Sequence, residues 1–220
     1  MDEAGWTRPP CFSRRRHHFP NRLLSIRKPA RAGRMDPITK LCPGTGTDVR
    51  VRHVDDGTGT RRVLAITGIF GKLSPDHVAD ELAKQKMDRG DVILLSSIGG
   101  EVPQTMAIGR EIRSRGLVTA IGEIDESGRL KPSLCAGACI IVFAGGAERL
   151  AISDSLLGGR CLLPPLEFEA YRDQMFDYFT SMGVSPKAAE AMSTDPDNGW
   201  VGMDKAIELK LATRPMRHAM

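Results

Sequence analysis

Short apolar runs alternate with helical patterns through the middle of the chain, and this alternation restricts the fold more than any other feature. Residues 63–70, 91–97 and 117–122 form short, mostly apolar runs, as in strands that are buried on both faces of a sheet. Between them, one helix is expected to open at Ser74-Pro75 and a second is expected over residues 102–115. Parallel strands that are joined by helices require right-handed crossovers. The alternation therefore predicts an α/β fold with a mainly parallel sheet.

Further elements are expected on both sides of this unit, within one domain over residues 48–214. A chain of 220 residues suits one domain and a tail better than two domains. Regular alternation of apolar and polar residues over 49–54 indicates a strand. The other expected elements are, in chain order, an apolar helical segment at 134–146, a strand at 149–152, a Gly158-Gly159 turn, and helices at 166–182, 186–192 and 203–211.

The first 47 residues differ in composition from the rest of the chain. Residues 1–34 hold nine Lys and Arg residues and two acids, a net charge of +7, whereas the remainder has a net charge of −3. Two interpretations stay open for residues 1–34: a basic, disordered tail that continues to residue 47, or a segment upstream of a true translation start at Met35. A nucleic-acid function would depend on this tail alone, so we expect no nucleic-acid partner.

The sequence also argues against a membrane protein and against a disulfide framework. The longest apolar run, residues 134–147, has 14 residues and contains three glycines, whereas a spanning helix needs roughly 20 apolar residues. No apolar stretch of signal-peptide length follows the basic residues 14–16. The five cysteines are odd in number and irregularly spaced. We therefore expect a cytoplasmic protein with no membrane partner.

Two glycine-containing segments are candidates for a binding site. Gly99 and Gly100 stand between an expected buried strand and an expected helix. Such a turn exposes backbone N–H groups at the carboxyl end of a strand, where open α/β sheets bind ligands. A tight turn that needs glycine for its backbone conformation is the alternative. Residues 134–149 place small residues before an apolar helix, which indicates either close packing or a nucleophile turn.

Five short motifs occur in a fixed order. They are ITGIFG at 66–71, LLSSIGGEV at 94–102, AIGREI at 107–112, CAGAC followed by AGGAER within 135–149, and LGGR at 157–160. Together they resemble the Clp protease and signal-peptide-peptidase group, over residues 63–212. The fourth motif is similar to the Cys-x-Ser-Ala-Cys pattern of a bacterial, often exported, Clp-like branch. The resemblance implies a ClpP/crotonase-like spiral of β-β-α units and assembly into homo-oligomers.

The same resemblance places the catalytic positions of that group on residues that cannot perform its chemistry. The nucleophilic serine of the group falls on Gly137, and its general-base histidine falls on Arg160. Glycine has no side chain, and arginine stays protonated, so it cannot accept a proton from serine. Independently of the resemblance, no histidine lies between residues 78 and 217. A third triad member would be sought at Asp195 or Asp197, where an Asp-Pro-Asp-Asn turn is the simpler account.

What the resemblance leaves in place is a set of backbone donors for an oxyanion. The donors that it implies are Gly99, Gly100 and the N–H of Ala138. They predict a pocket for a carboxylate, a peptide carbonyl or a thioester oxygen. The leading hypothesis is a non-catalytic Clp-like protein that binds a peptide or partner subunits, with no cofactor and no metal.

The alternative hypothesis is a serine-type or thiol hydrolase with a relocated nucleophile. Two serines flank the vacant positions, and three cysteines are nearby. Two of these cysteines are four residues apart, and a buried pair of structural thiols is the simplest interpretation. A zinc site would need three or four Cys or His ligands in a regular pattern, and no histidine is available here. The candidate substitutes are Ser133, Ser155, Cys135, Cys139 and Cys161.

Overall fold

The computed structural model describes residues 47–55, 60–70, 73–160, 165–194 and 197–216. They all lie in one unit of the chain, Arg31–Met220, and the other unit, Met1–Ala30, lies outside them. The tail expected over residues 1–47 and the start at Met35 therefore lie outside the described residues, except for Thr47. The domain limits at residues 48 and 214 stay a prediction.

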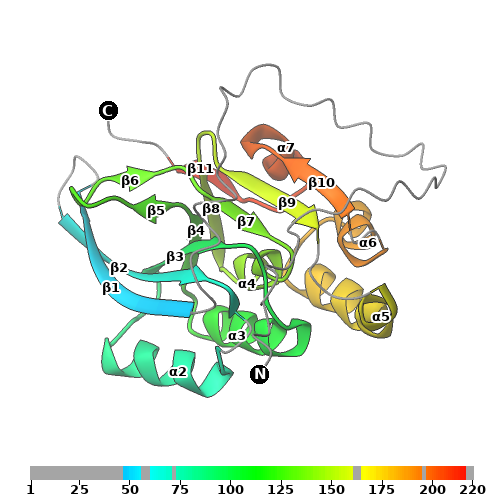
Figure 1. Cartoon of the computed structure of the whole chain (residues 1–220), viewed down its shortest axis with the longest axis horizontal. Coiled ribbons are helices and arrows are strands. Elements are labelled where there is room, and N and C mark those ends of the chain that lie inside the picture. Colours follow the sequence, from blue (N-terminus) through cyan, green and yellow to red (C-terminus); the bar gives the residue numbers. More distant parts are fainter. Residues whose placement is uncertain (1–46, 56–59, 71–72, 161–164, 195–196, 217–220) are drawn as a thin grey trace, which may run out of the picture. The chain divides into compact units, whose positions relative to one another are not determined.

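A mixed, mainly parallel sheet forms the centre of the fold (Figure 1). Its strand order is β10-β9-β7-β3-β4-β8-β11, and β2 pairs with both β3 and β1. Within the described part of this sheet, β1–β2 and β9–β10 are the antiparallel pairs and all other pairs are parallel. The strands are β1 (Thr47–Asp55), β2 (Thr60–Gly68), β3 (Val92–Ser97), β4 (Val118–Ile121), β7 (Leu134–Ala136), β8 (Glu148–Ile152), β9 (Leu156–Arg160), β10 (Asp197–Val201) and β11 (Arg214–Met216).

The sheet curls because strand β3 has two different neighbours along one of its edges. Strand β2 pairs with the whole length of β3, from Val92 to Ser97. Strand β4 pairs with β3 only from Val92 to Leu95, and β7 pairs with it at Ser97. Since β2 occupies one edge of β3, strands β4 and β7 share the other edge, and the sheet divides there. This arrangement is the curled, largely parallel sheet that the sequence predicts.

Both faces of the sheet are covered, as the continuous apolar runs predict. Leu94 and Ala120 belong to a buried cluster on one face, where Ile124 and Leu130 of a short β5–β6 hairpin pack against them. Ile93 and Leu95 alternate with Leu94 and are also fully buried. Helices α2, α3 and α4 lie on the side of the sheet opposite the hairpin (Figure 1). The remaining elements are β5 (Glu123–Ile124), β6 (Leu130–Lys131), α2 (Pro75–Lys84), α3 (Val102–Ser114), α4 (Cys139–Ala144), α5 (Pro165–Ser181), α6 (Pro186–Thr194) and α7 (Met203–Glu208).

Several predicted elements are confirmed, and two are wrong. Helix α2 opens as expected, because the Ser74 side chain accepts the N–H of His77 at 3.1 Å. Residues 134–146 do not form one helix: β7 occupies residues 134–136, and the left-handed backbone of Gly137, with φ of 54°, separates it from α4. The expected Gly158-Gly159 turn lies inside strand β9. No helix in the described part of the chain has the length and apolar character needed to cross a bilayer.

Helices α3 and α4 approach each other through two glycines. A Cβ atom built on Gly145 would lie 2.4–2.8 Å from three backbone atoms of Gly109. A Cβ atom on Gly109 would lie 1.8 Å from the hydroxyl oxygen of Tyr178, which itself donates to the carbonyl of Ile141 at 2.7 Å. The contact between α3, α4 and α5 therefore depends on the absence of side chains at these two positions.

A buried arginine joins strand β8 to the ends of two helices. Arg149 is 3% exposed, and its guanidinium donates to the carbonyls of Leu211, Lys210 and Met182 at 2.8–2.9 Å. Burial lowers the pKa of Arg149 to about 10, so the group is still charged at neutral pH. Arg113 donates to the same Met182 carbonyl at 2.9 Å. The two side chains thereby hold the C-terminal end of α5 against the sheet.

Candidate functional site

Three neighbouring strands bring the predicted site positions to one edge of the sheet. Ser97 on β3 pairs with Cys135 on β7, and Cys135 pairs with Leu157 on β9. All three strands are parallel, so their carboxyl ends meet at the same edge. The strand-end site, as we call this region, consists of Gly99, Gly100, Gly137, Ala138 and the backbone of Arg160.

In the turn after β3, the two glycines have different roles. The N–H of Gly99 donates to the hydroxyl of Ser97 at 3.2 Å, and its carbonyl accepts the N–H of Phe70 at 2.7 Å. A Cβ atom on Gly100 would lie 2.5 Å from the Cβ of Phe70, so the close approach of these two turns requires glycine. No described residue accepts the N–H of Gly100. Among the described residues, therefore, the N–H without an acceptor in this turn is that of Gly100 and not that of Gly99.

The turn after β7 has the strand-turn-helix form that presents a nucleophile in many hydrolases. Gly137 stands at the centre of this turn in the left-handed conformation and leads directly into α4. Its carbonyl and that of Ala138 accept the N–H groups of Ile140 and Ile141. Within the described residues, the N–H of Ala138 has no acceptor. The turn thus keeps a backbone donor, although glycine supplies no attacking atom.

A disulfide spans this turn, contrary to the expectation of two free thiols. Cys135 and Cys139 are bonded, with a Cα–Cα distance of 5.3 Å, and neither residue is exposed. The left-handed turn at Gly137 returns the chain, so the end of β7 and the start of α4 come within the usual range for a disulfide. Spacing alone did not reveal this, because two cysteines four apart also fit one helix face. Neither sulfur is a thiol nucleophile in this structure.

The candidate serines Ser133 and Ser155, which directly precede β7 and β9, form a hydrogen-bonded group with Ser96. The hydroxyl of Ser133 contacts that of Ser96 at 2.7 Å, and its N–H donates to the hydroxyl of Ser155 at 3.3 Å. The fully buried Ser155 donates in turn to the carbonyl of Ile121 at 3.1 Å. A catalytic serine needs a base within hydrogen-bonding reach, and these contacts contain no imidazole and no carboxylate. The contacts of Ser155 are those of a structural hydroxyl.

Of the two candidates for a third triad member, Asp197 lies within the described residues, as the first residue of β10. Asp197 pairs with Arg160 in the antiparallel register of β10 and β9. Asp195 and Cys161 lie outside the described residues. In the part of the chain that the structure describes, no three His, Cys, Asp or Glu side chains gather as metal ligands would.

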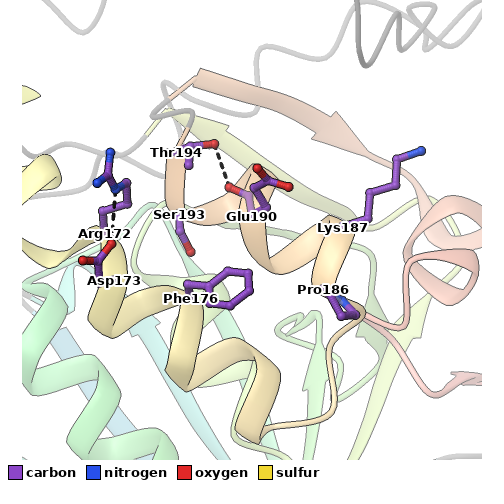
Figure 2. Close-up of a pocket in the computed structure, with 8 residues that line it drawn as sticks. All are labelled: Arg172, Asp173, Phe176, Pro186, Lys187, Glu190, Ser193 and Thr194. Atoms are coloured by element: carbon purple, nitrogen blue, oxygen red, sulfur yellow. Dashed lines mark hydrogen bonds and ion pairs between the residues drawn. The ribbon is translucent and has the colours of Figure 1, made fainter.

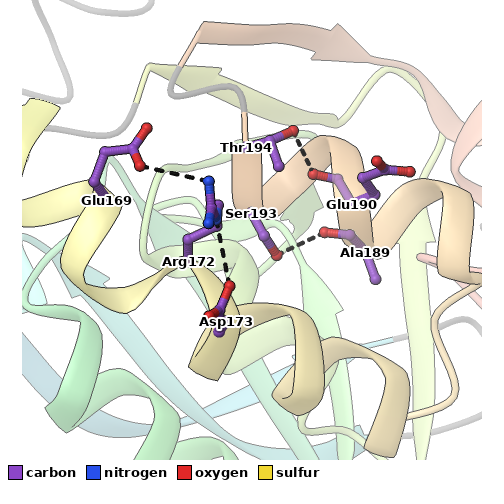
Figure 3. A network of polar contacts seen from close by, with 7 residues as sticks. All are labelled: Glu169, Arg172, Asp173, Ala189, Glu190, Ser193 and Thr194. Carbon is purple, nitrogen blue, oxygen red and sulfur yellow. Dashed lines mark hydrogen bonds and ion pairs between the residues drawn. The ribbon is translucent and has the colours of Figure 1, made fainter.

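A hollow of about 500 Å³ lies between α5 and α6, apart from the strand-end site (Figure 2). Phe176 and Pro186 supply apolar surface, and two residues of each charge line it as well. Arg172 lies 3.3 Å from Asp173, and the side chains of Ser193 and Thr194 donate to backbone carbonyls one turn earlier in α6 (Figure 3). None of the strand-end residues lines this hollow. The bonds of Arg172, Ser193 and Thr194 are thus to neighbours on their own helices.

No protein-family model and no curated protein matches the sequence. Among solved structures, a mutant of a membrane-bound stomatin-specific protease is similar, with a TM-score of 0.54 and 15% identity over 70% of this chain and 78% of that one. The ClpP protease catalytic domain from Plasmodium falciparum has a TM-score of 0.53 and 14% identity, over 69% of this chain and 83% of that one. ClpP1 from Listeria monocytogenes also has a TM-score of 0.53 and 14% identity, over 70% and 89% of the two chains. At such identities the likeness concerns the fold alone, and it confirms the predicted class: this chain has a ClpP-like α/β fold.

Proposed function

We propose that this chain is a Clp-protease-like protein without a catalytic serine–histidine pair, which binds a peptide through its carbonyl or carboxylate group. One observation carries this proposal. The carboxyl ends of β3, β7 and β9 meet, and the chain has Gly137 and Arg160 where the resemblance expects a nucleophile and a base. A hydrogen atom cannot attack a carbonyl carbon, and a protonated guanidinium cannot accept a proton.

The proposed donors to the ligand are the backbone N–H groups of Gly100 and Ala138. Both lack an acceptor among the described residues, whereas the N–H of Gly99 is already bonded to Ser97. Two such donors that converge on one oxygen stabilise a carbonyl or a carboxylate. Strand β9 ends at Arg160, a residue type that favours a carboxylate as ligand.

The alternative proposal is a hydrolase with a relocated nucleophile. Burial and a bond to the carbonyl of Ile121 count against Ser155, and the disulfide counts against Cys135 and Cys139. Ser133 is only partly buried, so it is the strongest remaining candidate among the described residues. Its hydroxyl contacts Ser96 and no base, which supports the non-catalytic proposal.

The proposal predicts that a fluorophosphonate probe does not label the purified chain, and that the double variant Gly137→Ser, Arg160→His becomes labelled and hydrolyses a peptide slowly. The double change restores a nucleophile and a base at the ends of β7 and β9. Asp197 pairs with residue 160 in the register of β10 and β9, so an acidic residue type stands on the adjacent strand. Mass spectrometry of the labelled peptide identifies the modified residue.

Two controls make this result decisive. Gly137→Ala measures the cost of a side chain in the left-handed turn, about 1–2 kcal/mol, without adding a nucleophile. Gly137→Ser alone has no base and should react far more slowly than the double variant. Labelling of Ser133 in the parent chain, lost together with hydrolysis in Ser133→Ala, would establish the alternative. A folded double variant that stays unlabelled would contradict the placement of the site.

We also propose that the chain assembles with copies of itself, as the resemblance implies. Helix α5 has half-buried aromatic side chains, Tyr171 and Phe176, that a partner subunit could cover. Native mass spectrometry of the full chain should show one defined multimer at micromolar concentration. A mass that stays monomeric across a concentration series would exclude this assembly.

A further inference from the structure

The turn at the strand-end site has few hydrogen bonds of its own. The Gly137 turn, residues 136–138, consists of alanine, glycine and alanine, and these side chains form no hydrogen bonds. Ala136 pairs with Gly158 at the end of the β7–β9 ladder, and beyond it the hydrogen bonds of the turn among the described residues are two short-range backbone bonds, into Ile140 and Ile141. Glycine has the largest conformational freedom of all residues. A turn of this composition needs another element to hold one shape.

The disulfide is anchored in rigid structure at both of its ends. Cys135 lies in β7 with Ser97 of β3 on one side and Leu157 of β9 on the other. Cys139 is the first residue of α4, in which every residue is buried. The bond therefore joins two fixed elements across three residues that carry little side-chain constraint.

We propose that Cys135 and Cys139 are positioning residues, whose disulfide holds the Gly137 turn in the shape that presents the N–H of Ala138. This inference deepens the proposed function and depends on it for the identity of the ligand. Formation of the bond removes one hydrogen from each thiol and passes two electrons to a disulfide oxidant, such as oxidised glutathione or a disulfide oxidoreductase, which leaves as two thiols. Because neither cysteine is exposed in the folded domain, we expect the bond to form during folding.

A structural disulfide also concerns the compartment in which the protein works. Disulfides persist in oxidising compartments and are rare in the reducing cytosol. The bond therefore counts against the cytoplasmic location that the sequence analysis leads us to expect. The proposal accordingly assigns the working form of this protein to an oxidising environment.

The first test asks whether the bond exists in the full chain after it has been refolded from denaturant in a buffer of reduced and oxidised glutathione. The protein is denatured with iodoacetamide and no reductant, then digested with trypsin, which leaves both cysteines on one peptide that ends at Arg149. We expect this peptide to carry neither a carbamidomethyl group nor glutathione and to weigh two hydrogens less than the dithiol form, whereas the same peptide from a chain that was reduced before alkylation carries two carbamidomethyl groups. Alkylation of both Cys135 and Cys139 would overturn the proposal.

The second test asks whether the bond acts on the turn. Hydrogen exchange at residues 136–140 should become roughly tenfold faster in the Cys135→Ser, Cys139→Ser variant, while the amides of α3 change little. The melting temperature should fall by about 5 °C, and Cys42→Ser should change neither quantity. If the double variant does not fold, the parent chain is compared with and without a dithiol reductant. Unchanged exchange in the turn would overturn the positioning role.

These results are separable from those on the proposed function. Both tests read the turn directly and require no ligand. A peptide that fails to bind to the fully oxidised chain, whose turn is nevertheless protected, would contradict the proposed function and leave the role of the disulfide established.

Discussion

Replacing Arg149 with methionine should lower the free energy of unfolding by about 4 kcal/mol, because several buried carbonyl groups lose their donor together. The guanidinium bonds to the carbonyls of Leu211, Lys210 and Met182, and more weakly to that of Gly146 at 3.4 Å. Methionine fills much of the volume but donates no hydrogen bond. Urea unfolding, followed by circular dichroism, measures the loss.

Two further variants separate the causes of this loss. Arg149→Lys keeps the charge but has one nitrogen in place of three, so it should recover only part of the stability. Arg214→Met removes an arginine whose ion pair with Glu148, at 2.6 Å, is exposed at both side chains. Surface pairs of this kind contribute about 0–1 kcal/mol, so this control should unfold almost like the parent. Equal losses in Arg149→Met and Arg214→Met would contradict the structural role of Arg149.

Replacing Gly145 with alanine should cost about 3 kcal/mol, because the new methyl group meets backbone that cannot rotate away. Its Cβ would lie 2.4–2.8 Å from the backbone of Gly109 in α3. Gly145 has φ of −63°, a helical value that alanine adopts more readily than glycine. Conformational preference therefore favours the variant, and any loss of stability must come from the contact between the helices.

A matched glycine supplies the control for this change. Gly202 also has an ordinary backbone conformation, with φ of −78°, and a Cβ atom built there meets nothing within 4 Å. Because it caps α7, alanine should cost less than about 1 kcal/mol there. Melting temperatures of the two variants provide the comparison. If the melting temperatures of Gly145→Ala and Gly202→Ala are equal, then α3 and α4 are not packed closely enough at Gly145 to exclude a methyl group.

The elements that the sequence predicted best are those whose signal is local and repeated. The apolar runs at 63–70, 91–97 and 117–122 became β2, β3 and β4, and both faces of this sheet are covered. Strand β9 was misjudged because two successive glycines usually mark a turn. In the structure Gly158 stays in the strand, where a Cβ atom would lie 2.0 Å from the carbonyl oxygen of Gly199 in β10. That neighbour is about forty residues away in the chain, so no local pattern announces it.

The candidate site divides in the same way between local and distant information. The absence of histidine from residues 78–217 and the presence of Gly137 and Arg160 are properties of the sequence alone. The N–H of Gly99 is bonded locally, to Ser97 two residues earlier, whereas the bond between its carbonyl and Phe70 depends on the fold. The residue type at a position limits the chemistry that this position can perform, whatever its place in the fold.

The sequence by itself determined the alternation of strands and helices and the absence of histidine from residues 78–217, since both follow from residue types and their order. Only the tertiary structure decided the partners: the disulfide between Cys135 and Cys139, the bonds of Ser155, and the carbonyls around Arg149. The physical reason is that a hydrogen bond or a disulfide depends on distances of a few ångströms. Those distances are set by the crossing of strands and helices from distant parts of the chain.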